Sequence, residues 1–245
     1  MNKSNLQSQL NFLTEKKVGL ELYFLHRISL SDPVEILRAN LEGTGVQDKL
    51  EDVFTNKIKA QILNVNREDN GVDWQLKHIK EIDDLKDTYY YFPNTPSTND
   101  DYHIPDEFNE MPTLWDKSYN TFPIFEFEKH SLDNVFAFLI RLQIDNDQVI
   151  LFKQKYPIDV LSRSTVLKIL NYERGHKTRF SLEQEPLLKM SDKIDFIFLN
   201  NNFIILNLSL LESKYGFRER YLKKGAEALE MIKRKNILSS TEKFE

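Results

Sequence analysis

The spacing of apolar residues along the first part of the chain predicts strands and one long helix. Residues 18–30 are dense in β-branched and aromatic side chains and predict a strand, which ends before Asp32-Pro33. In residues 47–63, apolar side chains recur at three- and four-residue steps, which predicts a helix. The alternation over residues 74–82 predicts a further strand.

The second half of the chain carries two β-hairpin signals. Asp145-Asn146-Asp147 forms the turn of the first, and Asn200-Asn201-Asn202 forms the turn of the second, because Asn tolerates positive φ. The paired strands are residues 135–144 with 148–155, and residues 193–199 with 203–210.

Two helices are expected beside these hairpins, over residues 158–171 and 211–235. The second has an apolar stripe that would cover the sheet. Since strands and helices mix without a repeating βαβ unit, the pattern predicts an α+β fold. It consists of antiparallel β-hairpins with flanking helices, and the C-terminal helix packs on the sheet.

A proline-rich stretch divides the chain. Prolines occur there at positions 93, 96, 105, 112 and 123. Such a density does not suit a central strand or an unbroken helix. We therefore predict an acidic N-terminal α+β region at 1–92, a linker at 93–123 and a basic α+β domain at 124–245.

Charge is distributed unevenly along the chain. Of 245 residues with a net charge of −5, residues 1–150 carry −11 and residues 151–245 carry +6. A basic half suits a polyanion, whereas an acidic half would be repelled by one.

Composition removes several classes of protein. The absence of Cys excludes disulfides, thiolate metal sites and Cys nucleophiles, and no apolar run approaches the ~18 residues of a membrane span. The N-terminus has no continuous apolar signal-peptide core, so a cytoplasmic protein is expected.

Common catalytic motifs are also missing from the sequence. The five histidines are scattered singly and provide no zinc spacing, Gly43-Thr44-Gly45 lacks the rest of a phosphate loop, and no G-x-S-x-G occurs. A nucleotide-dependent enzyme or a serine hydrolase is not expected, and no cofactor is predicted.

One arrangement could be catalytic: Asp195 followed by Glu212-Ser213-Lys214. It resembles the metal site of restriction-like nucleases, in which two carboxylates hold Mg²⁺ and a Lys assists. A hairpin centred on Asn201 would place Glu212 roughly 17 Å along the strand from the partner of Asp195, at ~3.4 Å per residue. The alternative is that both acids accept hydrogen bonds from backbone amides.

Basic residues form a second arrangement. In residues 163–179, five cations face a single acid, Glu173, with Tyr172 and Phe180 among and beside them. Cations and aromatic rings on one segment favour phosphate contact and stacking on nucleic acid. The candidate DNA-binding residues are Arg163, Lys168, Arg174, Lys177, Arg179 and, on the last helix, Arg220, Lys223 and Lys224.

The stretch from Met190 to Ile232 has a recognisable order. An Ile-Asp strand is followed by an Asn turn, a strand ending near Asn207, then Leu211-Glu212 and an aromatic-containing helix. Together with the preceding hairpin, it resembles the KwaB-like family, the B subunit of the Kiwa anti-phage defence system, over about residues 124–235. Leu211 stands where the family tends to have Phe.

The resemblance implies a cytoplasmic, dimeric DNA-binding effector of bacterial phage defence that acts with a membrane-embedded partner subunit and so reaches the inner membrane. The leading hypothesis is therefore duplex DNA binding without catalysis. A Mg²⁺-dependent nuclease using Asp195, Glu212 and Lys214 is the enzymatic alternative, and a protein-interaction module is the third.

Overall fold

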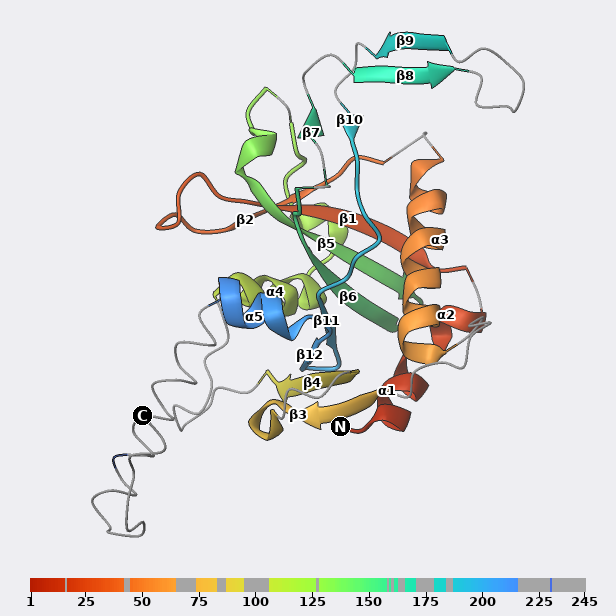
Figure 1. Cartoon of the computed structure of the whole chain (residues 1–245), viewed down its shortest axis with the longest axis vertical. Coiled ribbons are helices and arrows are strands. Elements are labelled where there is room, and N and C mark those ends of the chain that lie inside the picture. Colours follow the sequence, from red (N-terminus) through yellow and green to blue (C-terminus); the bar gives the residue numbers. More distant parts are fainter. Residues whose placement is uncertain are drawn as a thin grey trace.

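An eight-stranded sheet forms the centre of the computed structural model, in the order β2-β1-β5-β6-β11-β12-β4-β3 (Figure 1). The structure describes residues 1–15, 17–41, 45–64, 74–82, 87–94, 106–126, 128–157, 159, 161–162, 166–170, 179–183, 187–215 and 230. The strands of this sheet are β1 (Gly19–His26), β2 (Glu35–Arg38), β3 (Gln75–His78), β4 (Thr88–Pro93), β5 (Val135–Ile144), β6 (Asp147–Gln154), β11 (Phe196–Leu199) and β12 (Asn202–Ile205).

The two halves of the chain interleave in this sheet. The four central strands, β5, β6, β11 and β12, come from the second half, and the first half supplies two strands at each edge. β1 pairs with β5 on one side, and β4 pairs with β12 on the other, both antiparallel. The acidic and basic regions therefore share one sheet, and the predicted boundary at 93–123 does not coincide with a break in it.

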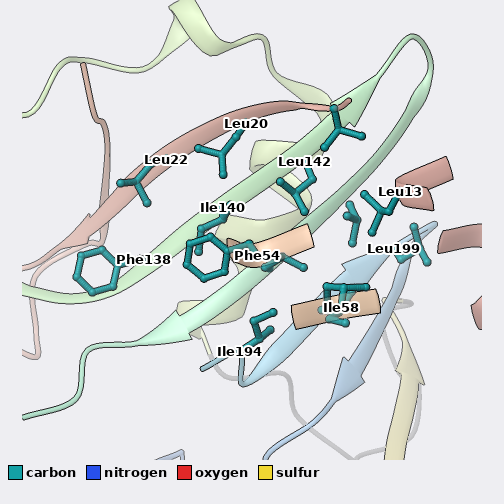
Figure 2. Packing of buried hydrophobic residues seen from close by; sticks show 14 of the residues in the cluster. Leu13, Leu20, Leu22, Phe54, Ile58, Phe138, Ile140, Leu142, Ile194 and Leu199 are labelled. Carbon is teal, nitrogen blue, oxygen red and sulfur yellow. The ribbon is translucent and has the colours of Figure 1, made fainter. Parts of the chain in front are cut away.

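Helices near the N-terminus cover one face of the sheet. They are α1 (Lys3–Leu10), α2 (Phe12–Glu15), α3 (Val46–Ile58) and the π-helical turn η1 (Lys59–Leu63). Figure 2 shows Phe54 of α3 beside Ile140 of β5, and Ile58 of α3, Leu142 of β5 and Leu20 of β1 belong to the same apolar cluster. All five side chains are buried.

The opposite face is covered by the segment that we expected to be a linker. It contains the short helix η3 (Asp106–Asn109) and α4 (Glu110–Asp116), and α5 (Leu208–Lys214) packs on the same side. Phe108 is fully buried, and its ring centroid lies 4.5 Å from that of Phe196. Pro112 is tolerated because it occupies the first turn of α4, where the backbone N–H has no helical partner.

Burial on both faces explains why β5 reads as an almost continuous apolar run. Leu139 faces the α4 side and Ile140 faces the α3 side, and neither is exposed. The α+β class is confirmed, with antiparallel hairpins, flanking helices and α5 packed on the sheet.

Both predicted hairpins and the first predicted long helix are present in the structure. The β5–β6 and β11–β12 hairpins are confirmed, and so is the helix over 47–63, whose last turn is the π-helix η1. The turn of the second hairpin contains only Asn200 and Asn201, both with positive φ. Its register pairs Phe196 with Ile205, one position away from the predicted one, because Asn202 belongs to β12.

The helix expected over 158–171 is wrong. The described part of this stretch contains β7 (Leu161–Ser162) and β8 (Val166–Leu170). β8 pairs with β9 (Arg179–Glu183), and β7 pairs with β10 (Leu187–Leu188). Pairing with a later segment of the chain overrides the local helical spacing.

The end of the chain begins its helix earlier than predicted. α5 starts at Leu208, because Asn207 accepts a hydrogen bond from the amide of Leu210 and so caps the helix. The expected strand over 203–210 therefore ends at Ile205. Of the predicted helix over 211–235, residues 216–229 and 231–235 lie outside the described residues.

Remaining short helices connect these elements. They are η2 (Ile79–Glu81), η4 (Tyr119–Thr121) and η5 (Leu132–Asn134). In the part of the chain that the structure describes, no helix is both long and apolar enough to cross a bilayer.

Candidate functional site

Most of the predicted DNA-binding residues belong to the segment between β6 and β11, residues 155–195, which leaves the eight-stranded sheet and returns to it. We call this segment the excursion. Figure 1 shows β8 and β9 apart from the eight-stranded sheet, where they form a two-stranded sheet of their own. Lys168 lies on β8 opposite Ser181, and Arg179 lies on β9 opposite Leu170. The backbone register thus places these two basic positions diagonally across one strand pair.

The other candidates lie outside the described residues. They are Arg163, Arg174, Lys177, Arg220, Lys223 and Lys224.

The base of the excursion is closed by the carboxylate of Asp159. Its Oδ1 accepts the amide N–H of Ser191 at 2.7 Å, and its Oδ2 accepts that of Tyr156 at 2.8 Å. The same Oδ2 lies 2.5 Å from the ammonium of Lys153, and neither side chain is exposed. Asp159 therefore joins the outgoing and returning ends of the excursion to β6.

Several hydrogen bonds determine the ionisation of Asp159. Burial by itself would raise its pKa, but the hydrogen bonds from Lys153 and from the amides of Ser191 and Tyr156 outweigh this effect and lower the pKa. The carboxylate is thus ionised at neutral pH, as the buried ion pair requires.

Asp195 forms a second buried centre just before β11. Its Oδ2 accepts the amide N–H of Gln154 at 2.9 Å, and its Oδ1 accepts the side-chain amide of Asn207 at 2.7 Å. The hydroxyl of Tyr156 also donates to Oδ1. Because Asn207 caps α5, Asp195 connects the end of β6 to the start of that helix.

Tyr156 links the two centres. Its amide donates to Asp159, while its hydroxyl donates to Asp195. Burial raises the pKa of the Tyr156 hydroxyl, and the hydrogen bond to Asp195 raises it further. The hydroxyl therefore stays protonated and serves as a donor. The ammonium of Lys193 lies 4.2 Å from the centroid of the Tyr156 ring, on which it makes a cation–π contact.

The geometry around Asp195 bears on the nuclease alternative. Glu212 and Lys214 lie within α5, not on a strand, with Glu212 half-buried and Lys214 exposed. Among the described residues there is no group of three or more His, Asp or Glu side chains that could hold a metal ion. Asp195 instead accepts a backbone amide, which is the role that the alternative interpretation of the sequence gave it.

Lys153, Tyr156, Asp159 and Asn207 were not among the predicted site residues. Lys153 had a detectable signal, because a cation interrupts the apolar strand that begins at Val149. A charge at such a position requires a buried partner. The partner itself, six residues later, could not be chosen from the sequence.

Comparisons with known proteins agree with the resemblance described above. The family model described as Kiwa protein KwaB-like matches residues 132–245. No curated protein and no solved structure matches the chain. The match contains the central strands β5, β6, β11 and β12, the excursion and both buried centres. Residues 132–245, which we call the KwaB-like region, are therefore similar to this family, and the similarity implies a role in Kiwa anti-phage defence.

Proposed function

We propose that this protein is a DNA-binding effector of a Kiwa defence system and that it contacts duplex phosphates through residues 163–179. The observation that carries the proposal is the position of this basic segment. Its two described strands, β8 and β9, form a sheet separate from the eight-stranded sheet that the acidic first half shares, which supports phosphate contacts away from that half. We infer from the sequence that Arg220, Lys223 and Lys224 provide further phosphate contacts.

The same proposal covers the partners. Kiwa is a system of several subunits, and we infer that this chain acts as a homodimer in the cytoplasm and meets a membrane-embedded subunit at the inner membrane. The acidic first half is unsuited to DNA and is available for that protein partner.

The test is the salt dependence of duplex binding, measured by fluorescence anisotropy. If about six phosphates are neutralised, log K falls against log salt with a slope near −5. Replacing Arg174 and Lys177 with Gln should reduce the magnitude of the slope by about 2, whereas replacing the exposed Lys49 and Lys129 should leave it unchanged. Binding that is insensitive to salt, or no binding, contradicts the proposal.

Incubation with supercoiled plasmid and Mg²⁺ separates binding from cleavage. We expect the plasmid to remain intact. Cutting by the native chain that is lost both in Asp195→Ala and in Lys214→Ala, whose side chain is exposed, would establish the nuclease alternative in its place. Failure to bind any duplex, combined with capture of an acidic protein subunit, would favour the interaction module.

A further inference from the structure

A surface pocket of about 400 Å³ lies where the two halves of the chain meet, beside the buried Asp195 centre. The first half contributes Lys57, Gln61 and Tyr89, and the KwaB-like region contributes Lys193, Ile194 and Asn207. Ile194 belongs to the apolar cluster that also contains Ile58 of α3 (Figure 2). The floor of the pocket is therefore held by the packed core.

The charge of the lining is one-sided. Among the described residues that line it, two carry ammonium groups and none is an acid, although Asp192 pairs with Lys57 and Asp195 lies 3.9 Å from Lys193. Asp195 is fully buried behind this surface and already accepts hydrogen bonds from Gln154, Asn207 and Tyr156. A lining that carries ammonium groups and no carboxylate of its own favours an anionic ligand that can compete with these neighbouring acids.

Each of the two lysines has a carboxylate nearby, but each lysine side chain is partly exposed. The Lys193 ammonium is 3.9 Å from Asp195 Oδ1, which is beyond hydrogen-bonding distance, and half of its side chain is exposed. Lys57 pairs with Asp192 at 3.0 Å, but both side chains are partly exposed to solvent. Exposed pairs of this kind contribute little to stability, so a phosphate can replace the carboxylate of Asp192.

The backbone beside the pocket departs from a regular helix. Ala60 and Gln61 belong to the π-helical turn η1, which is followed by Asn64 with a positive φ of 57°. Single π-helical turns occur frequently at functional sites. Here the turn presents Gln61, whose side-chain amide donates to the hydroxyl of Tyr89 at 3.0 Å.

We propose that this pocket binds a phosphate monoester of mononucleotide size, whose phosphate is contacted by Lys57 and Lys193. The apolar part of the lining, formed by Ile194, Leu206 and the Tyr89 ring, covers the organic group of the ligand. The volume falls within the range of small-molecule sites, which combine an apolar lining with a few polar groups. The site is distinct from the proposed duplex contacts of residues 163–179.

Calorimetric titration of the full chain without DNA tests the proposal. The probes are the four deoxynucleoside 5′-monophosphates, deoxyadenosine and inorganic phosphate. We expect at least one monophosphate to bind more tightly than both deoxyadenosine and inorganic phosphate. Lys57→Met and Lys193→Met should each weaken that binding about tenfold. Lys49→Met, an exposed change on the same helix as Lys57, should not alter it.

Three outcomes would overturn the assignment: no binding of any monophosphate, equal affinity for inorganic phosphate, or full affinity in the Lys57→Met/Lys193→Met double variant. Should that variant unfold, Gln61→Leu and Lys193→Gln provide a milder test of the same lining. Duplex affinity measured on the same variants separates this site from the proposed function, since it should be retained when the pocket is lost.

Discussion

Arg141 and Lys153 are buried on neighbouring strands, and each forms an ion pair, but the two pairs join different parts of the molecule. Arg141 on β5 pairs with Glu21 on β1 at 3.0 Å, and it donates to the main-chain oxygens of Leu114 and Lys117 at the end of α4. Lys153 on β6 pairs with Asp159, which lies within the same KwaB-like region.

The two ion pairs therefore have different structural roles. The Arg141 pair fastens the first half of the chain, including α4, to the KwaB-like strands. The Lys153 pair holds the ends of the excursion that carries the candidate DNA contacts. Damage to the first pair should loosen the whole fold, whereas damage to the second should also affect duplex binding.

The largest effect is expected from separating the two halves. A fragment of residues 124–245 would leave β5 and β12 without their outer neighbours and expose unpaired edge strands. We expect it to aggregate or remain unfolded in circular dichroism and size-exclusion measurements. A soluble fragment with its own cooperative thermal transition would show instead that residues 124–245 are an independent domain.

Asp159→Asn is expected to have the next largest effect. It leaves the Lys153 ammonium buried without a counter-charge, a type of change that costs about 3–5 kcal/mol. Urea unfolding measures this loss. If the excursion carries the DNA contacts, duplex affinity should also fall at temperatures where the variant is folded. The control is Asp192→Asn, which removes an exposed pair and should cost about 0–1 kcal/mol.

Arg141→Met should lower stability by about 3 kcal/mol, at the lower end of the same range. The carboxylate of Glu21 then still accepts hydrogen bonds from Tyr23 and Gln143, which limits the loss of stability. Duplex affinity of the folded variant should not change. A reduction as large as that in Asp159→Asn would remove the distinction between the two pairs.

The lowered pKa of Asp159 predicts a dependence on pH. Its ionised form contributes stability above the unfolded-state pKa of about 3.9, and the contribution is lost as the pH falls through the lower pKa of the folded state. The difference in Tm between the native chain and Asp159→Asn should therefore be constant from pH 7 to 5 and narrow below pH 4. A constant difference down to pH 2 would contradict this origin.

The smallest of these effects is expected for Asn207→Ala. The change removes the cap of α5 and one hydrogen bond to Asp195, at a cost of about 1–2 kcal/mol. Asn207→Asp tests the contributions separately, because it keeps a capping oxygen but brings a second carboxylate to Asp195. We expect the Asp variant to be the less stable of the two in urea unfolding.

Local patterns predicted the elements whose partners are close in sequence. The β5–β6 hairpin and α3 were predicted because their periodicity and turn residues are local. The pairing of β4 with β12 joins strands that are far apart in the chain, and no local sequence pattern indicates it. The division of the chain into two regions therefore missed the shared sheet. The same limit applies to the site: Asp195 was singled out, but its contact with Tyr156 depends on how β6 and β11 meet.

The interleaved sheet also determines when its strands can pair during synthesis. Phe92 of β4 pairs with Phe203 of β12, 111 positions later, and Leu139 of β5 is the partner of Tyr23. At ~5–20 residues per second, β4 waits roughly 5–20 s for its neighbour to leave the ribosome. Such non-local pairing slows folding and exposes strand edges in the meantime. We therefore expect the nascent first half to need protection by a chaperone until the four central strands of the KwaB-like region have been synthesised and can pair with β1 and β4.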